Sequence, residues 1–183
     1  MRQNLTVSIC FGSIAISNGL LKKLKDERTV TDALVLVTSS RNGAMQTVDA
    51  LLQRRSAKTL TEPGPDEEVL ELILKSAARA PDHGHLRPWR FIVIQGAGRK
   101  RFGDLLADYL RRTHPTVTED VLHRESQKAF RAPLIVVVAA ICDPVAKVPV
   151  IEQIISTGAA AQNIMLATFA LGFNAMWKTG GLA

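Results

Sequence analysis

The longest uninterrupted apolar run in the chain covers nine residues, from Leu134 to Cys142, and it limits what the chain can fold into. A helix that crosses a bilayer needs about 20 apolar residues, so we expect no membrane-spanning segment. The run follows Pro133 directly and is rich in Val and Ile, which favour strands. It therefore predicts a strand over Leu134–Ile141, the strongest strand signal in the sequence.

Helical and extended patterns alternate before and after this run. Asp66 is a good N-cap, and Glu67 and Glu68 suit the first turn of a helix that reaches about Ala80 and is stopped by Pro81. The other expected elements are helices over about 46–54, 99–112, 117–130 and 149–171, the last capped by Gly172, a strand Arg90–Gln95 buried on both faces, and a strand Phe173–Lys178.

The first 44 residues have a different character from the rest. Asn4–Leu20 shows no period of 2 or 3.6, although Leu34–Val37 has the composition of a strand. A loop signal precedes Met45, which is a natural start for a folded domain. We therefore expect a domain over 45–183, preceded by an extension over 1–44. That extension is a targeting segment, a disordered extension or the product of an upstream mis-start, and we favour the last.

The charge and cysteine content narrow the function classes. The net charge is +6, with 6 Lys/Arg against 3 Asp/Glu in residues 1–44 and 23 − 6 = 17 against 17 − 3 = 14 in the remainder. A surplus spread this evenly does not favour nucleic-acid binding, whereas a bound anionic cofactor explains it. The two cysteines, Cys10 and Cys142, exclude a disulfide scaffold and a Cys-based zinc site, and they suit the reducing cytoplasm.

Several short motifs are better explained by structure than by chemistry. Gly96-Ala97-Gly98 lacks the third glycine of a dinucleotide fingerprint, so we interpret it as a turn between a strand and a helix. His83 and His85 have no further His or Cys in support, so we expect no metal site. The basic run Arg99-Lys100-Arg101 has no interleaved aromatic residues and fits a solvated helix face.

Arg54-Arg55-Ser56, at the end of the first expected helix, is more informative. Arginine offers fork-shaped donors that match a phosphate, and Ser56 adds a neutral donor. Cations that complement a helix C-terminus explain the same residues, and on this motif alone that explanation is preferred.

The interpretation changes when three segments are taken together. They are Arg54-Arg55-Ser56, Arg79-Ala80-Pro81-Asp82-His83 with Pro88-Trp89, and Gly172-Phe173 leading to Trp177-Lys178-Thr179-Gly180. Their order and spacing resemble the nitroreductase family of flavoproteins, especially its small NAD(P)H nitroreductases. The resemblance covers 45–183 and includes Phe130-Arg131-Ala132-Pro133, Lys147-Val148-Pro149 and Glu152-Gln153.

The resemblance implies an α+β, three-layer α/β/α fold with a mostly antiparallel central sheet. It also implies a homodimer with FMN at the subunit interface, NAD(P)H as co-substrate and a nitroaromatic or quinone-like small molecule as electron acceptor. No catalytic side chain is implied, because the flavin N5 carries the chemistry. Carried over residue by residue, the FMN contacts are Arg54, Arg55, Ser56, Arg79 and His83, the last two from the other subunit, together with Trp177, Lys178 and Thr179.

The resemblance adds two expectations. A cation beside the reduced flavin raises its reduction potential, and Lys178 and Arg79 are both candidates. Similar proteins continue beyond Gly180-Gly181-Leu182 with a helix, another core strand and a tail, so we expect the last core strand and the tail to be missing. The alternative function is therefore a truncated, catalytically silent chain that acts as a subunit or binding partner.

Overall fold

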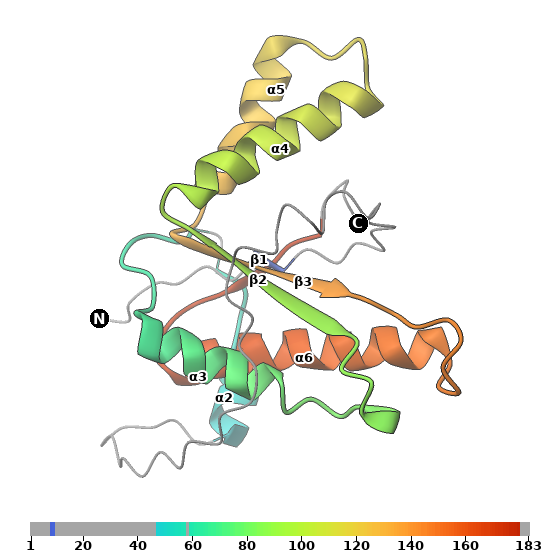
Figure 1. Cartoon of the computed structure of the whole chain (residues 1–183). Coiled ribbons are helices and arrows are strands. Elements are labelled where there is room, and N and C mark those ends of the chain that lie inside the picture. The colour runs from blue at the N-terminus through green and yellow to red at the C-terminus, as the bar shows by residue number, and fades with distance from the viewer. Residues whose placement is uncertain (1–7, 10–46, 58, 180–183) are drawn as a thin grey trace.

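A central antiparallel strand pair organises the fold. The computed structural model describes residues 8–9, 47–57 and 59–179 (Figure 1). Strand β2 (Trp89–Gln95) pairs with β3 (Leu134–Ala140), in a register that runs from Trp89 opposite Ala140 to Gln95 opposite Leu134. Helices pack on both faces of this pair, so the α+β fold expected from the sequence is confirmed.

Strand β3 is the centre of the core because its side chains alternate between the two faces. Leu134, Val136 and Val138 join the main hydrophobic cluster on one face. Ile135 and Val137 belong to a second cluster on the other face. The predicted strand is confirmed here, but the expectation that Arg90–Gln95 is buried on both faces is wrong. Within the described part of the chain β2 pairs only with β3, and most of its residues are half-buried.

Helices α3 (Glu67–Ala77) and α6 (Val150–Ala170) cover the first face (Figure 1). The backbone N–H of Val69 donates to the Asp66 carboxylate at 2.9 Å, which confirms the predicted N-cap. Helix α3 ends at Ala77 instead of about Ala80, because the chain tightens into a turn before Pro81. The Asn163 side-chain amide donates to the carbonyl oxygen of Ser76 at 3.1 Å and so ties α6 to the last turn of α3.

Helices α4 (Gly98–Thr113) and α5 (Glu119–Ser126) form an arm that extends from the opposite side of the sheet (Figure 1). Phe102 of α4 packs against the second hydrophobic cluster and anchors the arm. The single helix expected over 117–130 is two elements, α5 and the 3₁₀ helix η2 (Gln127–Phe130).

A second, parallel strand pair lies beside the first. Strand β1 (Ser8–Ile9) pairs with β4 (Met176–Trp177) and lies close to β3. The expected strand Phe173–Lys178 is shorter than the sequence indicated, because only Met176 and Trp177 pair with β1 and Ala175 makes an isolated bridge. No periodicity in Asn4–Leu20 predicted β1.

Helix α2 (Thr47–Gln53) packs against α6, and Gly172, at φ +90°, ends α6 as expected. The expected strand Leu34–Val37 and the domain start at Met45 lie outside the described residues. No helix in the described ranges is long and apolar enough to cross a membrane.

Candidate functional site

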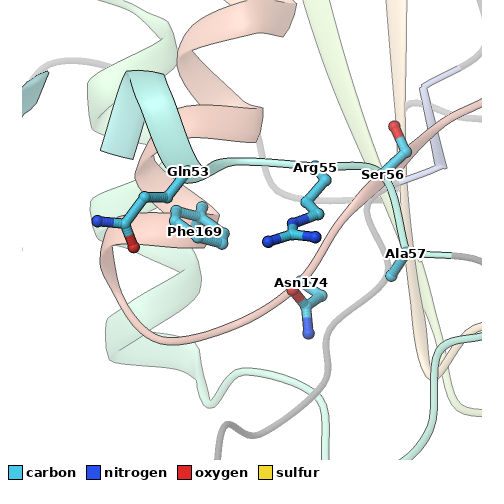
Figure 2. A pocket seen from close by; sticks show the side chains of 6 residues that line it. All are labelled: Gln53, Arg55, Ser56, Ala57, Phe169 and Asn174. Carbon is cyan, nitrogen blue, oxygen red and sulfur yellow. The ribbon is translucent and has the colours of Figure 1, made fainter. Parts of the chain in front are cut away.

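A pocket of about 470 Å³ lies where the chain leaves α2 and α6 (Figure 2). Residue Ser56 forms a parallel bridge with Ala175, and the backbone N–H of Ala57 donates to the carbonyl of Ala175 at 3.3 Å. This contact brings together two segments that the sequence predicted as parts of one site. The pocket is lined by Gln53, Arg55, Ser56, Ala57, Phe169 and Asn174.

Arg55 is the cationic group of this pocket. Figure 2 shows its side chain extending toward Asn174 and Phe169, whereas the Ser56 hydroxyl points away from it. Among the described residues that line the pocket, none is acidic. A guanidinium that faces a pocket without a carboxylate is suited to bind an anion.

Arg54 lies beside the pocket without lining it. Its Nη1 atom is buried and has no hydrogen-bond partner among the described residues. Buried donors are almost always paired in folded proteins, so an unpaired guanidinium nitrogen here indicates a missing acceptor. Of the two arginines of the motif, Arg55 lines the pocket, whereas the unpaired Nη1 of Arg54 is buried outside its lining.

The three predicted site residues near the C-terminus lie in the chain just after Ala175, the residue that bridges to Ser56. Trp177 is half-buried in β4 and packs against the main core, while Lys178 and Thr179 are exposed immediately after it. The bridge at Ser56 therefore places these residues in the same region as Arg54 and Arg55.

Arg79 and His83 do not join this group within one chain. His83 lines a second pocket, of about 230 Å³, between the loop after α3 and the N-terminal half of α6. Ile155 of that pocket and Phe169 of the first pocket are 169 − 155 = 14 residues apart on α6, which corresponds to about 21 Å along the helix axis. Arg79 is exposed in the turn that precedes this loop.

Sequence reasoning missed several of the residues that line the two pockets. Gln53, Phe169 and Asn174 line the first pocket, and Glu152 contacts His83 in the second, with 2.9 Å between Oε2 and Nδ1. Asn174 is the one polar residue between Phe173 and Trp177, and this position could have marked it as a candidate site residue. Glu152 was noticed only as part of a motif, because a pairing across 69 positions leaves no local pattern. In the described part of the chain, no three His, Cys, Asp or Glu side chains gather as metal ligands.

The comparison with protein families identifies the chain. The model of the family described as "Nitroreductase family" matches residues 51–183. The chain belongs to the nitroreductase family. The resemblance that the sequence motifs indicated is therefore confirmed.

Relatives within the nitroreductase family support this assignment. The Escherichia coli (strain K12) protein named "Putative NAD(P)H nitroreductase YdjA" is 39% identical over 138 residues, which cover 75% of this chain and 74% of the relative. A Haemophilus influenzae protein named "Putative NAD(P)H nitroreductase" is 39% identical over 137 residues, which cover 74% of this chain and 73% of the relative.

Solved nitroreductase structures share the fold. The nitroreductase-like family protein from Bacillus cereus superposes with a TM-score of 0.62 at 27% identity, over 82% of this chain and 74% of that one. A nitroreductase with bound FMN from Bacteroides fragilis gives a TM-score of 0.53 at 18% identity, over 70% of this chain and 66% of that one, and supports the fold alone.

Proposed function

We propose that the chain is an FMN-dependent oxidoreductase that accepts a hydride from NAD(P)H and passes two electrons to a nitroaromatic or quinone-like acceptor in a ping-pong cycle. The observation that carries the proposal is the Arg55 pocket, in a chain of the nitroreductase family. The relatives named NAD(P)H nitroreductases support it.

The residues at the pocket fit the phosphate end of FMN. A phosphate accepts several charge-assisted hydrogen bonds, and arginine can donate two of them in parallel. Arg55 faces the pocket, and Arg54 has a buried Nη1 without a partner in the described part of the chain. We assign the phosphate to Arg54 and Arg55, with Ser56 as a neutral donor after a rotation of its hydroxyl away from the direction seen in Figure 2.

The remaining residues would orient the cofactor and exclude water. FMN, when bound, supplies hydride transfer at its isoalloxazine ring, so the protein needs no acid–base pair for that step. Trp177 is held by the core and gives a fixed apolar wall, while Lys178 and Thr179 offer donors beside it. Lys178 and Arg79 are the two cations that could raise the reduction potential of the flavin. Of these, Lys178 is the one that the Ser56–Ala175 bridge brings into the region of Arg55.

We further propose that the functional unit is a homodimer with the cofactor at the subunit interface. His83 lines the second pocket, whose Ile155 lies about 21 Å along α6 from Phe169 of the Arg55 pocket, so one site that includes both pockets needs two chains. Both α2 and α6 also expose large apolar side chains, among them Leu52 at 80% and Ile155 at 64% exposure. Apolar surface of this kind marks protein interfaces.

A cytoplasmic location is part of the same proposal. It is supported by the content of only two cysteines and by the supply of reduced pyridine nucleotide that the reaction requires.

The test compares Arg55→Gln with Arg124→Gln, which removes the same charge from an exposed position on α5. Loss of a charge-assisted bond to phosphate should weaken FMN binding by about 10- to 100-fold for Arg55→Gln, measured by quenching of FMN fluorescence. The Arg124 variant should bind as the parent does. Equal affinities in all three proteins would contradict the assignment of the pocket.

Steady-state kinetics test the reaction itself. A ping-pong cycle gives parallel double-reciprocal lines when NADPH or NADH is varied at several fixed acceptor concentrations. Purified protein that is replete with FMN but turns over no nitroaromatic or quinone would refute the proposed activity.

A further inference from the structure

His83 and Glu152 contact each other, although hydride transfer at a flavin requires no acid–base pair of the protein. The imidazole Nδ1 lies 2.9 Å from Glu152 Oε2, and both residues line the 230 Å³ pocket together with Ser156 of α6. The pair joins the loop after α3 to the first turn of α6. The two side chains are 72% and 46% exposed, so the contact is a surface pair that orients the imidazole toward α6.

The chemistry of the carboxylate determines which imidazole nitrogen carries hydrogen. An ionised carboxylate only accepts hydrogen bonds, so Nδ1 of His83 must be the donor in this contact. A neutral imidazole has one hydrogen on its two nitrogens, so Nε2 is then an acceptor. Because Nδ1 is engaged by Glu152, Nε2 is the imidazole nitrogen that is left for a ligand in this pocket.

The loop that carries His83 is held in one conformation. Gly84 and His85 both have positive φ, at 76° and 53°, and the Asp82 carboxylate closes the loop by accepting from the backbone N–H of Arg87 at 2.6 Å. A Cβ on Gly84 would lie 3.1 Å from Val148 Cγ2, so the loop rests closely on the segment before α6. A positive φ is energetically unfavourable for a residue with a side chain, such as His85, and is retained only where the surrounding structure enforces it.

Gln153 fixes that supporting segment. It is 2% exposed, and its amide donates to the carbonyl oxygens of Asp143 and Val148, both at 2.9 Å. Its carbonyl oxygen accepts from the backbone N–H of Asp143 at 2.8 Å. The backbone segments that carry His83 and Glu152 are therefore both supported by hydrogen bonds before any ligand binds.

We propose that Glu152 is a positioning residue that holds His83 as the Nδ1–H tautomer and so presents Nε2 as a hydrogen-bond acceptor. The ligand that this pocket takes would then carry an N–H donor, as the isoalloxazine ring of FMN does. This inference rests on the proposed function for the identity of the ligand, but not for the state of His83.

The tautomer is tested first, in the full chain without added ligand. The ¹⁵N chemical shifts of the histidine rings would be recorded at about pH 9, where histidines are generally neutral, and His83 would be assigned from its loss in His83→Gln. We expect the Nδ1–H pattern for His83 in the parent protein and its loss in Glu152→Ala, while Glu152→Gln, which can either accept or donate, should weaken it. An Nε2–H pattern in the parent, or a pattern unchanged by both Glu152 variants, would overturn the inference.

A double-mutant cycle then tests whether Glu152 acts through His83. Glu152→Ala and His83→Ala should each weaken FMN binding by about 3- to 10-fold, the range of one hydrogen bond. The double variant should be no weaker than His83→Ala alone. Additive losses would overturn the positioning role. His85→Ala, which removes the exposed histidine two positions away, is the matched control and should bind FMN normally.

The two measurements separate the possible failures. A parent protein that binds no FMN would refute the proposed function, while the ring nitrogen shifts would still decide the role of Glu152.

Discussion

The arm formed by α4 and α5 depends on one glycine, and a single methyl group should disturb it. Gly103 is buried in α4, and a Cβ built on it would lie 2.6 Å from the backbone oxygen of Ser126, at the end of α5. Ordinary contacts of a Cβ begin at about 3.4 Å, so the two backbones would have to separate by about 3.4 − 2.6 = 0.8 Å. The obstacle is backbone, so a change of side-chain rotamer cannot relieve it.

The expected cost follows from two opposing effects. Replacing glycine by alanine within a helix stabilises it by about 1 kcal/mol, whereas overpacking costs about 1–3 kcal/mol. We expect Gly103→Ala to lower the free energy of unfolding by up to about 2 kcal/mol, and Tm to fall by about 2–4 °C for each kcal/mol lost. Gly98→Ala is the matched control, because its Cβ would meet Ile94 Cγ2 at an ordinary 3.6 Å.

The assay is thermal and urea unfolding followed by circular dichroism, with all variants at one protein concentration, because association changes apparent stability. Gly98→Ala should be as stable as the parent or slightly more stable. If Gly103→Ala matched or exceeded the stability of Gly98→Ala, the close contact between α4 and α5 would be refuted.

Two further predictions concern surface and reactivity. Ile155→Glu places a charge on the exposed apolar surface of α6 and should shift the chain from dimer to monomer in sedimentation velocity, whereas the exposed Val145→Glu, in the loop before α6, should leave the dimer intact. Burial raises the pKa of the Cys142 thiol above its usual value, so less of it is thiolate at a given pH. In a Cys10→Ser background, alkylation of Cys142 by iodoacetamide at about pH 8 should therefore be slower than that of an unstructured cysteine peptide, and an equal rate would refute the burial.

The sequence was most informative where local chemistry decides the structure. Asp66 with its following acids identified the start of α3, and Gly172 identified the end of α6, because caps depend on a few neighbouring residues. The apolar run after Pro133 identified β3 because a strand buried on both faces needs apolar residues throughout. These elements depend little on the rest of the chain.

Long-range pairing was beyond the reach of sequence patterns. The expected strand Phe173–Lys178 is reduced to β4 because Ala175 bridges to Ser56 and only Met176–Trp177 pair with β1. The motifs did predict that Arg55 and Trp177 belong to one region. They did not predict the pairing of His83 with Glu152, because nothing in the local sequence encodes a contact across 69 positions.

The central claim, that this chain holds FMN at the Arg55 pocket, is tested most directly by a visible absorption spectrum of the purified chain after incubation with FMN and desalting. We expect the two visible flavin bands to be retained, with as many FMN molecules as chains, and NADH or NADPH to bleach them in the absence of oxygen. A colourless protein after desalting would contradict it.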